Sequence, residues 1–203
     1  MYPETTMQSS THRSEDRRVG FLFNNGHTPG SEYKRYEKLV LGYQHRVYGF
    51  AFYLLGDREG AEDVTQEVLL RLWKHRDGVD EDRVLAWLLR VTRNACMDEL
   101  RKRMTYHNLV DVDSERVDHA MAGGLAPDVE TEQADFQRRL QRALNQVAEP
   151  YRSIVILREI QDMKYEDIGD ALGLPLNTVK VYLHRGRKML REQLSEVLER
   201  ETT

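Results

Sequence analysis

The side chains best suited to chemistry in this chain lie in one segment near its carboxyl end. Positions 176–191 hold five Lys or Arg residues and no acid, although the whole chain of 203 residues carries a net charge of −4. Helical spacing puts Val179, Leu183 and Gly186 on one face and the bases on the opposite face. A helix with such a basic face is typical of proteins that contact DNA phosphates and read base edges in the major groove.

The residues before this helix predict a helix-turn-helix. Positions 165–172 have the apolar spacing of a short helix, and Gly173 supplies the permissive backbone of a tight turn. Pro175 cannot extend the first helix, and Asn177 or Thr178 is the expected cap of the second. The alternative is an ordinary helical hairpin with a solvated basic face. A metal site is not indicated, because no second ligand lies one helical turn from His184.

A second polar stripe is predicted on a helix from about position 82 to 103. Its spacing places five residues on one face, namely Arg90, Arg93, Asn94, Met97 and Arg101. The amide of Asn94 can pair with a base edge, which favours a nucleic-acid contact. The alternative is that cations near the end of a helix complement its dipole.

The preceding predicted helix has the opposite charge at its start. Glu59, Glu62, Asp63 and Glu67 occupy its early turns, and bases follow later. This order suits the helix dipole, but it also fits a contact surface for a basic partner.

Composition excludes several classes of protein. Charged residues make up 32% and aromatic residues 8%, and no stretch is long and apolar enough to cross a membrane. The amino-terminal segment lacks the apolar core of a secretory signal. Cys96 is the single cysteine, which excludes an internal disulfide. We therefore expect a cytoplasmic protein without a metal or other cofactor.

Apolar residues recur at three- and four-residue steps, so the expected fold is all-α with two small helical domains. Residues 1–32 are expected to be a disordered tail, whose short apolar cluster 21–23 is either a docking patch or incidental. Residues 33–103 are expected to form a bundle of three to four helices, and residues 136–203 a domain of four helices. Between them, residues 104–135 hold eight acids and one base, which predicts a flexible, self-repelling linker and variable spacing of the domains.

Five segments together resemble a known family. AEDVTQEVLLRLW from Ala61 and AWLLRVTRNACMDELR from Ala86 resemble region 2 of the extracytoplasmic-function (ECF) sigma factors. PYRSIVILR from Pro150, followed by YEDIGDALG and TVKVYLHRGR, resembles their region 4. The resemblance spans residues 36–198 and has both motif blocks in the family's order.

The resemblance implies a subunit that directs bacterial RNA polymerase to promoters, not an enzyme. Region 2 of the family clamps the β′ coiled coil of the core polymerase; the matching positions are Asp63, Gln66, Glu67, Leu70 and Trp73. Region 2 also holds the non-template strand of the minus-10 element, which implicates Arg90, Arg93, Asn94, Met97, Arg101, Lys102 and Arg103.

Region 4 of the family rests on the β flap and places its recognition helix in the minus-35 element. The implied contacts are Asn177, Thr178, Lys180, Val181, Tyr182, His184, Arg185, Arg187 and Lys188. Family members are often held by an anti-sigma factor, which in many cases is bound to the membrane. Such a partner is therefore expected here, without membrane insertion of the chain itself.

The chain departs from the family pattern at two places. Ala148-Glu149-Pro150 stands where Leu-Pro is usual, and Tyr182 stands where a small or basic residue is common, so base preference does not transfer. A free-standing helix-turn-helix regulator remains an alternative, although it would need to dimerise. An enzyme finds no support, because there is no phosphate-binding glycine loop and no nucleophile with a nearby base.

Overall fold

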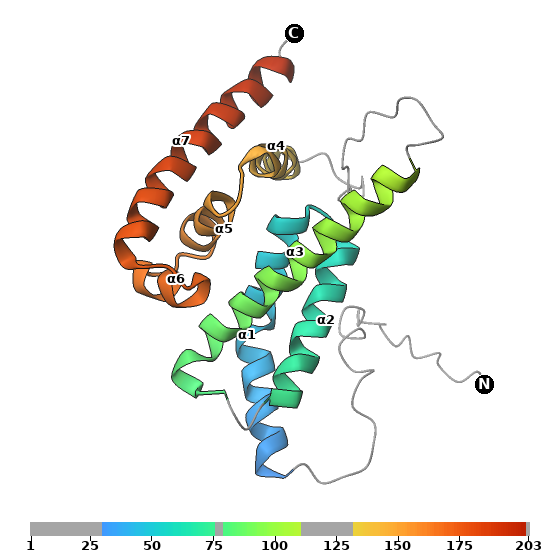
Figure 1. Ribbon diagram of the computed structural model, residues 1–203, viewed down its shortest axis with the longest axis vertical. Coiled ribbons are helices and arrows are strands. Elements are labelled where there is room, and N and C mark those ends of the chain that lie inside the picture. Colours follow the sequence, from blue (N-terminus) through green and yellow to red (C-terminus); the bar gives the residue numbers. More distant parts are fainter. Residues whose placement is uncertain (1–29, 76–78, 111–131, 202–203) are drawn as a thin grey trace, which may run out of the picture.

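The computed structural model describes residues 30–75, 79–110 and 132–201, and every element in these ranges is a helix (Figure 1). The predicted all-α class is therefore confirmed. In chain order the elements are α1 (Ser31–Leu55), α2 (Arg58–His75), the 3-10 turn η2 (Glu81–Arg83), α3 (Val84–Val110), α4 (Glu132–Gln146), α5 (Tyr151–Val155), the π-helical segment η3 (Ile156–Ile160), α6 (Tyr165–Leu172) and α7 (Leu176–Glu201).

Helices α1, α2 and α3 pack as one bundle. Their apolar stripes meet in a core that includes Phe50, Leu72 and Leu88, which are all fully buried. Gly56 ends α1 in the left-handed conformation (φ 78°), where a side chain would be strained. Asp57 follows at once, and its Oδ1 atom accepts a hydrogen bond from the backbone N–H of Gly60 at 2.6 Å. A glycine stop followed at once by an acidic cap is a signal that the sequence itself carries.

Helices α4 to α7 form the second bundle, which contains the predicted helix-turn-helix. Gly173 (φ 68°) ends α6 in the left-handed conformation, and α7 begins three residues later. Val179 and Leu183 anchor α7 in the core. Gly186 lies so close to α5 that an added Cβ would be 2.6 Å from Cγ2 of Val155. A glycine is thus required at this crossing.

Two element boundaries differ from the prediction. The third helix was expected to end near position 103, but α3 continues to Val110. Helix α7 begins at Leu176, so Asn177 and Thr178 lie in its first turn and neither occupies the predicted cap position. The expected tail and residues 111–131 of the expected linker lie outside the described residues.

The two bundles lie against each other instead of standing apart. Helix α3 runs beside α6 (Figure 1), and a single buried core extends through both bundles. Arg46 of α1 donates to the carbonyl of Gln161 at 2.8 Å, and the amide of Gln161 donates back to the Arg46 carbonyl at 2.8 Å. The variable spacing expected from the acidic linker is therefore not what the described residues show.

None of the described helices has the length and apolarity needed to cross a membrane. Within the same ranges, no three His, Cys, Asp or Glu residues are grouped so that they could hold a metal ion.

Candidate nucleic-acid and polymerase interfaces

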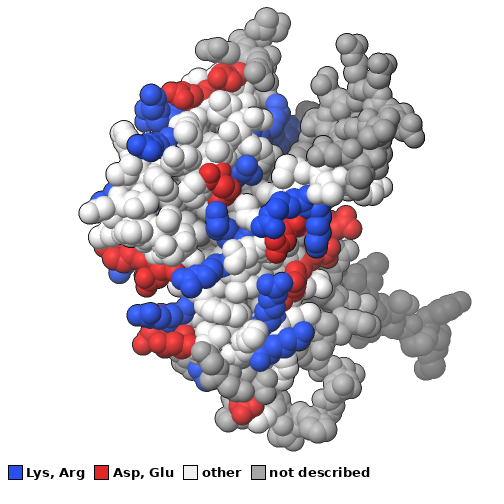
Figure 2. All heavy atoms as spheres, viewed as in Figure 1, with Lys and Arg blue, Asp and Glu red and all other residues white. Residues whose placement is uncertain are grey.

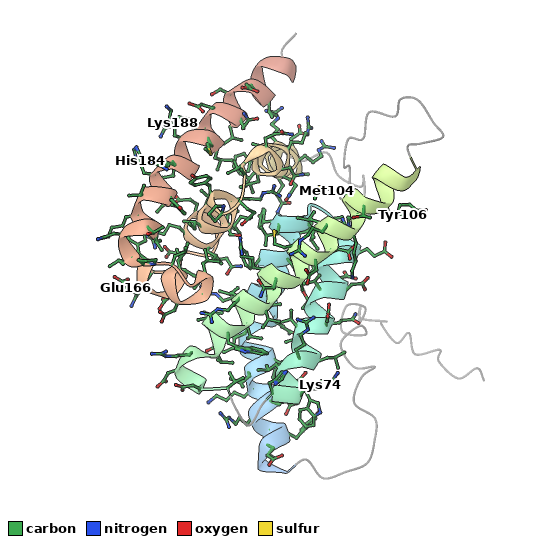
Figure 3. The ribbon with its side chains drawn as sticks, in the orientation of Figure 1. Lys74, Met104, Tyr106, Glu166, His184 and Lys188 are labelled. Carbon is green, nitrogen blue, oxygen red and sulfur yellow. The ribbon has the colours of Figure 1, made fainter. Side chains whose placement is uncertain are left out.

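The outer face of α7 presents the predicted major-groove residues. Lys180, Val181, His184, Arg185 and Lys188 are exposed, with the buried residues of α7 on the opposite face. His184 and Lys188 project away from the second bundle (Figure 3). This is the arrangement that a recognition helix needs, since the domain anchors one face and leaves the other open.

Two other predicted residues of α7, Thr178 and Tyr182, are less accessible. Asn177 is exposed, but Thr178 and Tyr182 are half-buried. The ring of Tyr182 packs edge-on against Tyr151 with centroids 5.1 Å apart. The unusual tyrosine therefore braces α7 against α5.

Arg187 is restrained by an acid from η3. Its Nε and Nη2 atoms donate to Oε1 of Glu159 at 3.0 and 2.7 Å. These hydrogen bonds raise the pKa of the Arg187 guanidinium. Lys188 has only a loose pairing with Glu192 at 3.9 Å.

The stripe on α3 divides into two parts. Asn94 and Arg101 are exposed and Met97 is half-buried, so this part faces outward. Arg101 pairs with Asp98 at 2.8 Å and Lys102 with Glu99 at 3.8 Å, both on the surface. Basic and acidic side chains lie next to one another on the face of the molecule in Figure 2.

The amino-terminal part of the stripe contacts the second bundle. The Arg90 guanidinium donates to the backbone carbonyl groups of Asp170 and Ala171, the latter at 3.3 Å, at the carboxyl end of α6. Arg93 donates to Oε2 of Glu149 at 3.1 Å and to Oγ of Ser153 at 3.2 Å. Sequence reasoning singled out Glu149 as a departure from the family but did not predict this contact.

Arg103 points away from the stripe. Its Nη1 lies 2.6 Å from Oδ2 of Asp57 and its Nε 3.0 Å from Oε1 of Glu99. These partners raise the pKa of the Arg103 guanidinium despite its partial burial. The contact joins α3 to the start of α2, a role that the sequence did not suggest.

Behind the stripe, Cys96 is fully buried and free. Burial, with a smaller contribution from the nearby Glu149 charge, raises the pKa of its thiol to about 12. The thiol is therefore neutral at physiological pH, and it serves as a small apolar core residue.

The predicted polymerase surface lies on α2. Asp63, Gln66, Glu67 and Leu70 are all exposed, and the Leu70 side chain is an unusually open one for leucine (56%). Trp73 instead is half-buried, and its ring packs edge-on against Tyr36 with centroids 5.0 Å apart. The first four residues thus form a surface, while Trp73 mainly fixes α2 to α1.

A groove of about 910 Å³ separates this acidic surface from the outward part of α3. Asp63 and Glu67 line one wall, and Arg101 and Lys102 line the other. Tyr106 also lines this groove, and both Tyr106 and Met104 are exposed on α3 (Figure 3).

Comparison with known proteins agrees with this arrangement. Residues 39–105 match the family described as Sigma-70 region 2, and residues 137–190 match Sigma-70, region 4. The RNA polymerase sigma-E factor of Streptomyces avermitilis is 32% identical over 164 residues, which cover 80% of this chain and 87% of that protein. The ECF RNA polymerase sigma factor SigW of Bacillus subtilis is 28% identical over 164 residues, covering 76% and 86%.

A similar solved structure is that of the sigma factor RpoE in complex with the anti-sigma factor NepR from Bartonella quintana. It superposes with a TM-score of 0.61 at 25% identity, over 80% of this chain and 98% of that one. With both domains matched in order and the two bundles built as described, the chain belongs to the ECF family of RNA polymerase sigma factors, which bind core polymerase and direct promoter-specific transcription.

Proposed function

We propose that three separate surfaces divide the work of promoter recognition in this sigma factor. The exposed face of α7 reads the minus-35 duplex. The stripe from Arg90 to Arg101 on α3 holds the non-template strand of the minus-10 element. The exposed acids of α2 hold the β′ coiled coil of core polymerase, and region 4 rests on the β flap.

The observation that carries this proposal is the position of Asn94. Its side chain is exposed on α3 between basic residues, next to the buried Ala95 and Cys96 that fix the helix in the core. An amide held on a rigid helix is suited to hydrogen bonding with the edge of an unstacked base. Arg101 and Lys102 lie further along the same helix, where they can hold phosphates of the same strand.

The test separates reading of the duplex from capture of the opened strand. Opening DNA costs about 1.4 kcal/mol per base-pair step in lost stacking, so capture must compensate for this cost. We expect Asn94→Ala to slow open-complex formation by holoenzyme on a normal duplex and to weaken binding to a template with a pre-melted minus-10 bubble. Arg185→Ala should affect only promoters with a good minus-35 sequence.

The control for both variants is Lys38→Ala, an exposed change on α1 outside the proposed surfaces. The assignment of α3 is overturned if Asn94→Ala behaves as wild type on both templates. The assignment of α7 is overturned if Arg185→Ala loses activity equally on promoters without a minus-35 match.

We also propose that an anti-sigma factor controls this protein in the cytoplasm. Support comes from the similar structure of RpoE, which was solved in complex with the anti-sigma factor NepR. Affinity purification of the tagged full chain from its own cells, followed by identification of the bound proteins, tests this. Recovery of core polymerase with no further stoichiometric partner contradicts it.

A further inference from the structure

The contacts of Arg90 and Arg93 bear on how the two regions act in the free protein. Both side chains belong to the face of α3 that we assign to the minus-10 strand. Both guanidinium groups are directed at oxygen atoms of region 4, and their partners are the α6 carbonyl groups of Asp170 and Ala171 and the carboxylate of Glu149. Region 4 therefore contacts this end of the DNA face, where the Arg93 side chain is largely covered and Arg90 stays exposed.

The Glu149 contact is a compact polar cluster. Arg93 donates to Oε2 of Glu149 through both Nε (3.2 Å) and Nη2 (3.1 Å). The same oxygen accepts a hydrogen bond from Oγ of Ser153 at 2.6 Å. The Arg93 and Glu149 side chains are only 27% and 21% exposed, so water screens this pair less than a surface pair.

These partners resemble a nucleic-acid backbone in chemistry. A carboxylate offers a guanidinium anionic oxygen atoms, as a phosphate does. The carbonyl groups at the end of α6 carry the negative end of a helix dipole. In both arginines the Nε and Nη2 donors are engaged in this way, so these donors are not available to a DNA phosphate or base while the contact holds.

The interface between the two regions also leaves some hydrogen-bond acceptors unpaired among the described residues. Three buried side-chain oxygen atoms have no hydrogen-bond partner among the described residues: Oε1 of Gln141, Glu149 and Gln161. All three side chains bridge the regions, because Gln141 donates to the Tyr53 carbonyl at 3.1 Å and Gln161 to the Arg46 carbonyl. Separation of the regions gives each of these acceptors access to water, which lowers the cost of opening.

We infer that Glu149, with the carboxyl end of α6, is an intramolecular mimic of the DNA backbone that holds region 4 over the Arg90 and Arg93 end of the minus-10 face. The free chain is then closed against DNA, and core polymerase and promoter must displace region 4. The inference rests on the proposed role of α3, and it adds a specific function for Glu149.

Energy transfer between two dyes tests this closure in the full chain. Arg83, just before α3, and Glu166, on α6, are exposed positions at which cysteines can be introduced and labelled. The native Cys96 is fully buried and does not compete. The variants are Glu149→Gln, which removes the charge, and Glu149→Ala, which also removes the bond to Ser153.

Asp162→Asn is the matched control. Asp162 also pairs with an arginine, Arg158 at 3.2 Å, but within region 4. Its φ of 49° is one that asparagine tolerates well. The control thus removes one charge from region 4 without touching the interface.

We expect transfer efficiency to fall in Glu149→Gln and further in Glu149→Ala, with Asp162→Asn unchanged. Affinity of the free chain for random-sequence single-stranded DNA should rise about tenfold in Glu149→Gln, because a larger share of molecules is open. In an Arg93→Ala background, Glu149→Gln should change the efficiency no further, since the two side chains act as one contact.

Wild-type efficiency in both Glu149 variants, with native helicity, overturns the inference and leaves the assignment of α3 intact. A fall in efficiency without a gain in DNA affinity supports the closure by Glu149 and overturns the assignment of Arg93 to the DNA strand. The two failures are therefore distinguishable.

Discussion

Arg103 and Asp57 join α3 to the start of α2, the two helices on which we propose the DNA and polymerase surfaces of region 2. The Nη1 atom of Arg103 lies 2.6 Å from Oδ2 of Asp57, while the other oxygen of the same carboxylate caps α2 through the Gly60 N–H. A Cβ on Gly60 would be 2.4 Å from the Arg103 guanidinium, so the glycine makes room for the pair. The contact holds α3 against the start of α2.

We expect Arg103→Ala to lower the free energy of unfolding by about 1–2 kcal/mol, because it leaves partly buried acceptors without their partner. Lys102→Ala is the control, since Lys102 is exposed and its pairing with Glu99 is loose. Urea unfolding followed by circular dichroism measures both. If Arg103→Ala unfolds like wild type but loses DNA affinity, its side chain belongs to the DNA stripe after all.

The second prediction concerns the acidic face of α2. Glu67 is exposed and makes only a surface pair with Arg71, at 2.6 Å. Glu67→Lys should therefore leave stability within about 0.5 kcal/mol of wild type. It should weaken binding to core polymerase by about tenfold, because a like charge replaces an attractive one at a polar interface. Fluorescence anisotropy with labelled sigma factor measures the affinity, and Glu37→Lys on α1 controls for net charge. If the two variants bind core polymerase with equal affinity, Glu67 does not lie in the interface.

The third prediction separates three bases of α7. Arg185 is exposed, and its replacement by alanine should cost about 1–3 kcal/mol of discrimination between promoters. Lys188→Ala should weaken binding to all duplexes alike. It should also lower the slope of log affinity against log salt concentration, the salt slope, by about one unit. Arg187→Ala should do less than either, because Glu159 already neutralises its guanidinium. Binding of holoenzyme to a minus-35 duplex at several salt concentrations measures all three. If Arg187→Ala lowers the salt slope by a full unit, then Arg187 must leave Glu159 and contact a phosphate when DNA binds.

The fourth prediction compares two glycines in helices. Gly186→Ala should destabilise the protein by about 1–3 kcal/mol, because the new Cβ would be 2.6 Å from Val155 and 3.2 Å from the Tyr151 carbonyl. Gly42→Ala should instead stabilise it by about 0.5–1 kcal/mol, since nothing lies within 4 Å of its added Cβ and alanine is the better helix former. Urea midpoints that shift in the same direction would contradict the close approach of α7 to α5.

The fifth prediction concerns Cys96, whose thiol has a pKa of about 12 in the folded protein. Its reaction with a disulfide reagent at pH 8 should be at least about 100-fold slower than that of a free cysteine, and should become normal in concentrated urea. Above pH 9 the unfolded thiol ionises and the folded one does not. Stability should then fall by up to about 1.4 kcal/mol per pH unit relative to Cys96→Ala. A fast native reaction would show that the thiol is accessible.

Much of the fold could be predicted because local chemistry determines it. The left-handed glycines at positions 56 and 173, the Asp57 cap and the apolar stripes each act within a few residues of the chain. The carboxyl end of α3 was missed, since polar residues that continue a helix look like the start of a linker. The start of α7 was placed too late because two good capping residues follow Leu176.

The candidate site was harder to predict, because its contacts join distant parts of the chain. Arg93 and Glu149 are separated by 56 positions, and Arg90 contacts backbone atoms that any sequence would supply. The spacing of residues along a helix predicts which side chains lie on the same face. It does not predict which of them contact another domain. The departure at Glu149 from the family's usual leucine was the one available signal.

In the closure that we infer, Arg90 and Arg93 exchange their region 4 partners for the minus-10 strand, so binding of the strand and release of region 4 are linked. Binding of the minus-10 strand weakens the contact of region 4 by some factor. By linkage, release of region 4 must raise the affinity for that strand by the same factor. A ligand that spans both regions would therefore act as a competitor of the minus-10 strand even if it never touched Asn94. By the same reciprocity, mutations in region 4 far from α7 can change how strongly a promoter depends on its minus-10 sequence.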